Sequence, residues 1–168
     1  MIVTLRPITI NDTANIIRWR NSDIVRSMFI DRTLLTQETH NEWLNTFVST
    51  GKVVQMIISL SSTGHDIGSI FLKDIDPIHH KAEFGIFIGE KTELGKGYGL
   101  SATKQIITYG FSKLKLHKIY LRVLKTNESA IRMYEKAGFK KIGIFKDDVF
   151  VDNTYLDIVF MEILNVQS

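Results

Sequence analysis

The sequence predicts an α/β domain with a mixed central sheet of about seven strands and helices on both faces. Residues 53–60, 67–72 and 81–89 have the apolar or alternating character of strands, and their short connections permit only antiparallel pairing. A glycine-rich loop at 94–100 then leads into a helical segment and a β-branched, aromatic strand at 117–124. A strand, a helix and a second strand in this order can form a parallel crossover, so the sheet is expected to be mixed.

The N-terminal part is expected to form one strand and two helices. Residues 2–6 read as a short strand that ends at Pro7, because proline cannot donate to a sheet ladder. Asp12 is placed to cap a helix over 14–19, and Thr36 is placed to cap a second helix.

The central and C-terminal parts contain the remaining strands. Residues 61–66 carry a hairpin signal between two strand segments. In the strand at 81–89, the alternation puts Ala82, Phe84, Ile86 and Ile88 on one face and Glu83 and Phe87 on the other. The later elements are a helix to about residue 113, the strand at 117–124, a helix at 127–137 stopped by Gly138, and strands at 139–145 and 155–164.

Composition narrows the class of protein. The chain has 168 residues, 44% of them hydrophobic, so we expect one domain spanning residues 1–168. With 21 basic against 18 acidic residues and a net charge of +3, nucleic-acid binding is not expected. No apolar run is long enough for a membrane span, and the first residues lack the pattern of a signal peptide. The absence of cysteine excludes disulfides, and we expect a cytoplasmic protein.

The loop Leu-Gly-Lys-Gly-Tyr-Gly-Leu at 94–100 is the most informative segment. Alternate glycines leave backbone N–H groups uncovered, and the following helix presents its positive dipole end. Both features favour a phosphate or pyrophosphate, although a glycine-rich turn without a ligand is the structural alternative.

Two nucleotide-binding motifs fit this loop poorly. Residues 97–102 formally match the dinucleotide fingerprint, but the next strand carries Tyr120 and Arg122 rather than the expected acid. A Walker A motif would need Ser or Thr where Gly97 stands.

A second motif, Asn-Glu-Ser-Ala-Ile-Arg-Met-Tyr-Glu-Lys-Ala-Gly-Phe, occupies residues 127–139. With the loop, it resembles the GNAT superfamily of acetyl-CoA-dependent N-acetyltransferases, over nearly the whole chain. Residues 94–99 occupy the position of that superfamily's acetyl-CoA motif, with Leu94 in place of the usual Gln or Arg. The resemblance implies a GNAT fold and acetyl-CoA as the donor, with no metal.

The same resemblance implies how the donor is held. The strand at 81–89 would splay from 118–124, and the pantetheine arm would pair with its open edge near Phe87 and Ile88, where an N–H would polarise the thioester carbonyl. Asn127 would contact the cofactor arm, cap its own helix, or do both. The pyrophosphate would lie on the N–H groups of Gly95, Lys96, Gly97, Tyr98, Gly99 and Leu100, with the Lys96 side chain either adding charge or being mere surface.

Two residues are candidates for acid–base work. By resemblance, Tyr134 would protonate the departing CoA thiolate; the alternative is a core tyrosine. Glu83 is the best carboxylate for taking the amine proton, with a solvent-facing residue as its alternative. The adjacent His79 and His80 lack further spaced ligands, so we predict no metal site.

The N-terminal helices would select the acceptor amine. The Trp-Arg-Asn run at 19–21, with Met28 and the later His40 and Trp43, resembles the branch containing UDP-4-amino-sugar N-acetyltransferases of the pseudaminic acid type. That branch also has relatives that acetylate aminoglycosides or, less closely, ribosomal protein N-termini.

We therefore expect the amino group of a nucleotide-linked amino sugar as acceptor. A protein N-terminus, or an aminoglycoside or polyamine, is the alternative. The candidate substrate-binding residues are Arg20, which would pair with a diphosphate or stack on uracil, Asn21, and Phe29, which would supply a stacking face. The expected assembly is a monomer or homodimer.

Overall fold

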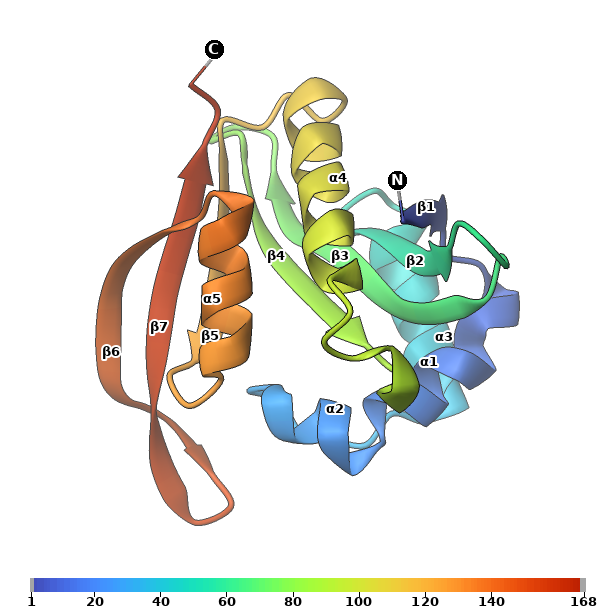
Figure 1. Cartoon of the computed structure of the whole chain (residues 1–168), viewed down its shortest axis with the longest axis horizontal. Helices are drawn as coiled ribbons and strands as arrows, with labels where there is room; N and C mark the ends of the chain where they lie inside the picture. The colour runs from blue at the N-terminus through green and yellow to red at the C-terminus, as the bar shows by residue number, and fades with distance from the viewer. Residues whose placement is uncertain (1, 167–168) are drawn as a thin grey trace.

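The computed structural model describes residues 2–166, which contain a seven-stranded sheet in the order β1-β2-β3-β4-β5-β7-β6 (Figure 1). Every neighbouring pair is antiparallel except β4 and β5. The predicted mixed α/β sheet is thereby confirmed. The strands are β1 (Val3–Pro7), β2 (Val54–Leu60), β3 (Asp66–Asp76), β4 (Lys81–Ile88), β5 (Lys118–Leu124), β6 (Lys140–Val151) and β7 (Thr154–Leu164).

Helices cover both faces of the sheet, as expected. The α-helices are α1 (Thr13–Arg20), α2 (Asp23–Met28), α3 (Gln37–Trp43), α4 (Tyr98–Ser112) and α5 (Glu128–Ala137), with a π-helical turn at Leu44–Val48 after α3. In Figure 1, α4 and α5 lie in front of the sheet, while α1 and α3 lie behind β2 and β3. None of the helices within residues 2–166 is both long and apolar enough to cross a membrane.

The two faces of the sheet build two separate apolar cores. Residues that alternate along each strand divide between them: Met56 and Ile58 join the core under α4 and α5, whereas Ile57 joins the core under α1, α2 and α3. The predicted division of β4 is confirmed, because Phe84 lies in the first core and Phe87 in the second. We call these the α4–α5 face and the α1–α3 face.

Two local predictions for the N-terminal part need correction. Asp12 stands at the N-cap position of α1 but makes no side-chain cap bond; its carboxylate binds Arg6 and the Thr9 N–H instead. Arg6 offers a charged partner, which a carboxylate prefers to a neutral amide. The helix α2 does not follow from the sequence pattern, since six residues are too few to show a period. Thr36, in contrast, caps α3 as predicted by accepting from the Thr39 N–H.

Three boundaries differ most from the sequence-based prediction. The strand β3 continues to Asp76 rather than ending at residue 72. The helix after the glycine loop begins at Tyr98 rather than Ser101, so Gly99 lies inside its first turn. The strand β6 continues to Val151 instead of ending at residue 145. Its pairing with β7 is irregular between Phe145 and Val149, and this bulge hides the strand's period in the sequence.

Candidate active site

The neighbouring strands β4 and β5 are paired over only three positions. Lys81, Ala82 and Glu83 pair with Lys118, Ile119 and Tyr120, and no pairing follows. Figure 1 shows the two strands diverging beyond this short pairing. The backbone of β4 after Glu83 therefore has an open edge toward β5, as the family resemblance implied.

The hydrogen bonds between β4 and β3 show which residues of β4 turn their backbone groups toward this edge. The Gly89 N–H donates to the Ile67 carbonyl of β3 at 2.8 Å, and Phe87 is in register with Ser69. Because both backbone groups of a residue point to the same neighbour and alternate along the strand, Phe87 faces β3. The groups facing the open edge belong to Phe84, Ile86 and Ile88. The prediction placed the open-edge N–H groups near Phe87 and Ile88; by this parity Ile88 keeps that position, and Ile86 takes it in place of Phe87.

The glycine loop adopts the conformation that its sequence suggests. Gly95 and Gly97 have φ angles of +76° and +83°, a region that glycine enters without strain. Gly97 is the N-cap of α4, and Ser101 donates the first intrahelical bond to its carbonyl. The N–H groups of Tyr98, Gly99 and Leu100 consequently have no acceptor within the helix, which is the arrangement that attracts an anion.

The first turn of α4 lies against the open segment of β4. A methyl group placed on Gly99 would meet nothing closer than Met133 Cε of α5 at 3.9 Å and Ile86 Cδ1 of β4 at 4.0 Å. No packing or backbone strain in the chain requires glycine here, so the room beside Gly99 is open to a ligand. The Lys96 side chain forms an exposed ion pair with Glu93 at 3.0 Å, which agrees with its surface alternative.

Tyr134 and Asn127 approach the site from α5. The ring of Tyr134 is buried edge-on against Phe84 and Phe139, with centroids 5.6 and 6.0 Å away. Burial raises the pKa of its phenol well above the ordinary value, so the hydroxyl stays protonated at neutral pH. Asn127 caps α5 by accepting from the Ala130 N–H, which is the structural role considered for it.

Glu83 lies at the point where β4 and β5 part, on the α1–α3 face. Its buried carboxylate accepts from Arg122 Nε at 3.2 Å and Nη2 at 3.3 Å, and lies 3.5 Å from Lys73 Nζ. A carboxylate of β4 thus joins cations from β3 and β5. Lys73 and Arg122 were not predicted as partners of Glu83, although the register between neighbouring strands indicates both.

The three predicted acceptor residues occupy different positions on the α1–α3 face. Arg20 holds its guanidinium 3.6 Å from the centre of the Phe29 ring, and Phe29 packs edge-on against Phe87 at 5.9 Å. Asn21 instead uses its amide to hold the Leu35 backbone, donating to the carbonyl and accepting from the N–H, both at 2.8 Å. Arg20 and Phe29 are brought together, while Asn21 positions the segment that follows them.

Arg20 is a partly buried cation without a carboxylate partner among residues 2–166. Its Nη1 is buried and has no hydrogen-bond partner, and its Nη2 reaches only the Asp31 carbonyl at 3.4 Å. Burial lowers the pKa of its guanidinium, and the charge of Asp31 opposes this. A desolvated guanidinium with a free donor is a ready contact for an anionic group.

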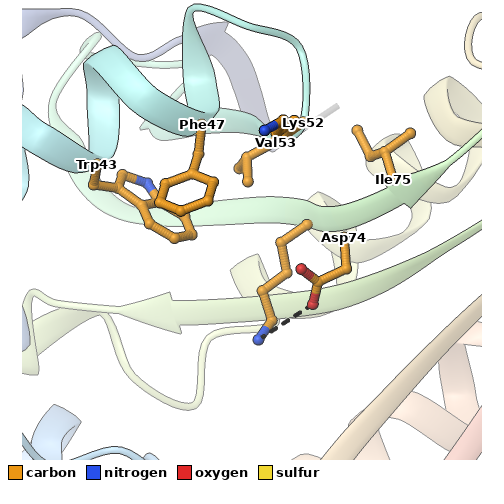
Figure 2. Close-up of a pocket in the computed structure, with 7 residues that line it drawn as sticks. Trp43, Phe47, Lys52, Val53, Asp74 and Ile75 are labelled. Carbon is orange, nitrogen blue, oxygen red and sulfur yellow. Dashed lines mark ion pairs between the residues drawn. The ribbon is translucent and has the colours of Figure 1, made fainter.

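A pocket of about 410 Å³ lies between the end of α3 with the turn after it and the end of β3. Figure 2 shows Trp43 and Phe47 at one end and Asp74 and Ile75 at the other. Lys73 also lines the pocket, so the ion pair with Glu83 borders it. None of the predicted site residues lines it. Within residues 2–166 no three potential metal ligands come together.

Comparison with known proteins identifies the class. Residues 3–140 match the family described as the acetyltransferase (GNAT) domain, so the chain belongs to that family. This agrees with the GNAT fold, the enzyme class and the acetyl-CoA donor that the two motifs implied.

Among individual proteins, the chain is 43% identical over 76 residues to spermidine N(1)-acetyltransferase of Escherichia coli K12, covering 45% of this chain and 40% of that protein. It is 35% identical over 72 residues to a putative ribosomal N-acetyltransferase of Bacillus subtilis, covering 43% and 39%. The chain therefore matches less than half the length of these curated relatives.

A solved structure matches over a longer range. Spermidine N-acetyltransferase from Vibrio cholerae, in complex with CoA and spermine, superposes with a TM-score of 0.90 at 28% identity, covering 97% of this chain and 95% of that one. Two of these three proteins are named as spermidine acetyltransferases and one as a putative ribosomal acetyltransferase, so the predicted UDP-amino-sugar branch gains no support from them.

Proposed function

We propose that this chain is an acetyl-CoA-dependent N-acetyltransferase whose acceptor is a primary amine on a small molecule. The observation that carries this proposal is that the first turn of α4 lies beside the strand with the open edge, β4: a Cβ added to Gly99 would stand 4.0 Å from Ile86 Cδ1. Free N–H groups at 98–100 would hold the pyrophosphate. The open edge beside them would pair with the pantetheine arm and bring its thioester to the point where β4 and β5 diverge.

Acetyl transfer needs a hydrogen bond to the thioester carbonyl and a proton for the departing sulfur, and different residues would supply them. The acceptor nitrogen forms a bond to the acetyl carbon, the carbon–sulfur bond breaks, and CoA leaves as a thiol. The N–H of Ile86 or Ile88 would donate to the carbonyl oxygen as charge develops there. Tyr134 would give the proton to the departing sulfur, because burial raises the pKa of its phenol and keeps the proton in place at neutral pH.

Glu83 would receive the proton that the amine loses. Its carboxylate is already bound by Arg122 and Lys73, so the transfer would pass through a water or follow a displacement of Lys73. The Lys73 ammonium is chemically the same group as a protonated acceptor amine. An acceptor arriving as an ammonium would therefore compete with Lys73 for the same carboxylate.

Two classes of acceptor are supported by different observations. A polyamine of the spermidine class is supported by the E. coli and V. cholerae relatives, and it was one of the alternatives to the amino-sugar prediction. An amine that also carries an anionic group, such as a nucleotide-linked amino sugar, is supported by the unpaired, partly buried Arg20. We propose the polyamine class first and the anionic amine second.

The test is a turnover screen that follows release of the free CoA thiol. The panel contains spermidine, a UDP-linked amino sugar, an aminoglycoside and a peptide with a free N-terminus, each compared with hydrolysis of acetyl-CoA alone. Amine-dependent turnover is expected, with spermidine fastest. Turnover on the peptide alone would overturn the small-molecule acceptor, and no turnover on any amine would overturn the enzymatic proposal.

The predicted assembly, location and partners of the chain stay proposals. A related spermidine acetyltransferase structure from V. cholerae is described as dodecameric, whereas we expect a monomer or homodimer for this chain. We also keep the prediction of a cytoplasmic protein that binds neither nucleic acid nor membrane.

A further inference from the structure

Lys73 of β3 holds its ammonium between two carboxylates. Its Nζ lies 3.5 Å from Glu83 Oε2 and 3.9 Å from Asp74 Oδ2, and the dashed line beside Asp74 in Figure 2 marks the second of these ion pairs. The Glu83 side chain is 10% exposed, whereas that of Asp74 is 67% exposed. The ammonium therefore stands between a buried carboxylate, where β4 and β5 diverge, and an exposed one that lines the pocket.

Asp74 belongs to an irregular stretch of β3. In a regular strand, neighbouring side chains point to opposite faces of the sheet, so Asp74 would turn away from the face that Lys73 and Glu83 share. The register of β3 with β4 shifts between Lys73 and Asp76, and Asp74 has a φ of +51°. This left-handed conformation is strained for a residue with a side chain, although aspartate tolerates it better than most. The irregular backbone leaves a second carboxylate within reach of Lys73.

The two cations that hold Glu83 are not equivalent. Arg122 donates to both carboxylate oxygens, from Nε to Oε1 at 3.2 Å and from Nη2 to Oε2 at 3.3 Å. Its planar fork matches the carboxylate, whereas Lys73 places a single ammonium on a flexible stem beside Oε2. If Lys73 moves away, Glu83 still has Arg122, so its buried charge stays paired. Lys73 is therefore the cation that another ammonium can replace.

We propose that Lys73 occupies the position on Glu83 that the acceptor ammonium takes, and that Asp74 receives Lys73 when the acceptor arrives. This inference rests on the proposed function for the identity of the arriving amine. Lys73 and Asp74 both line the pocket, so the four-carbon stem of the lysine can turn there without repacking the core. Each ammonium has a carboxylate partner after the exchange, and no charge is left buried and unpaired.

The exchange makes Lys73 a residue that determines acceptor specificity. An uncharged ligand cannot replace the charge of Lys73 beside Glu83, whereas a protonated primary amine is chemically the same group. Lys73 therefore weakens the binding of every acceptor by competing with it, but it penalises uncharged ligands most. A polyamine of the spermidine class arrives as a cation and meets this requirement.

The test measures the dissociation constant of spermidine by calorimetric titration of the full chain saturated with CoA. Lys73→Met removes the competing ammonium, so spermidine is expected to bind about fivefold more tightly, with the affinity for CoA unchanged. A lysine that only supported the structure would, when replaced, leave spermidine binding unchanged or weaken it. Asp74→Asn removes the second position for Lys73, and spermidine is expected to bind about threefold more weakly.

The double variant separates the exchange from general electrostatics. Because Asp74 acts through Lys73, Lys73→Met with Asp74→Asn is expected to bind spermidine as Lys73→Met alone does. Lys73→Arg keeps a competing cation and is expected to bind no more tightly than the wild type. The matched control is Lys81→Met, which removes the same charge two residues before Glu83 on β4; its dissociation constant is expected to change less than about twofold.

Release of the CoA thiol from acetyl-CoA, followed in parallel, separates this inference from the proposed function. Turnover on spermidine with an unchanged dissociation constant in folded Lys73→Met overturns the exchange and leaves the proposed function standing. The expected order of affinities without turnover overturns the proposed function and supports the exchange. A wild-type chain that does not bind spermidine overturns the exchange, as does an Asp74→Asn effect that persists in the double variant. Circular dichroism shows whether each variant is folded.

Discussion

The two faces of the sheet are built on different principles. On the α4–α5 face, the candidate donor site consists of backbone groups: the first turn of α4 and the open edge of β4. On the α1–α3 face, the candidate acceptor site consists of charged side chains from α1, β3, β4 and β5 and of the aromatic ring of Phe29 after α2. Backbone donors recognise a feature shared by all acyl-CoA donors, whereas side chains can differ between relatives. We therefore expect the donor side to be shared within the family and the acceptor side to set the specificity.

The largest expected effect concerns Tyr134 of α5, the proposed proton donor. Replacing it with Phe keeps the ring among Phe84 and Phe139 but removes the proton donor. Turnover is expected to fall about 100-fold, as for loss of a general acid, with little change in CoA affinity. Steady-state kinetics and calorimetric CoA titration measure the two quantities. Unchanged turnover would assign Tyr134 to the core alone.

A substitution of Arg20 tests whether side chains on the α1–α3 face select the acceptor. Arg20→Met keeps a straight side chain over Phe29 but removes the charge. If the acceptor carries an anion, its kcat/KM is expected to fall at least ~10-fold, the cost of losing a charge-assisted hydrogen bond, while that of spermidine stays the same or rises. The matched control is Arg26→Met on α2, whose guanidinium pairs with the exposed Asp23. An equal loss on both classes of acceptor would contradict a role for Arg20 in specificity.

A substitution of Gly99 tests whether CoA is bound through backbone groups at the start of α4. Gly99→Ala meets no atom closer than 3.9 Å within the chain, and alanine favours helix by up to about 1 kcal/mol. The melting temperature is expected to stay constant or rise. Affinity for CoA is expected to fall about tenfold, because a methyl group would occupy the room beside the free N–H groups. Ser101→Ala, further along α4, is the control; equal CoA affinity for both variants would place the pyrophosphate elsewhere.

The smallest effect concerns His40, a buried residue under the acceptor side. Its Nδ1 lies 3.0 Å from Thr13 Oγ1, and its Nε2 has no hydrogen-bond partner among residues 2–166. Burial lowers its pKa despite the charge of Asp12. The unfolded chain takes up the proton near pH 6.5 while the folded chain does not. Stability is therefore expected to fall as pH drops below about 6.5, by at most about 1.4 kcal/mol per unit. Urea unfolding at several pH values measures this slope, which should be shallower for His40→Gln; identical slopes would contradict it.

Much of the donor side could be predicted from sequence because its elements are local. The positive φ of Gly95 and Gly97, the cap at Asn127 and the alternation of β4 each depend on a few neighbouring residues. The pairing parity of Phe87 did not follow from sequence, since it depends on the register of β4 with β3. Asp12 was predicted to cap α1 because the pattern does not show that Arg6, six residues earlier on β1, turns its guanidinium toward this carboxylate.

The sequence by itself determined the fold class, the glycine-rich loop before α4 and the membership of the GNAT family, because helix termini, glycine conformations and strand alternation are properties of short segments. Only the tertiary structure decided which cations hold Glu83, how far Arg20 is desolvated and which edge of the sheet stays open. These depend on which distant strands become neighbours. A side chain's charge partners and its exposure to water exist only once the sheet has assembled.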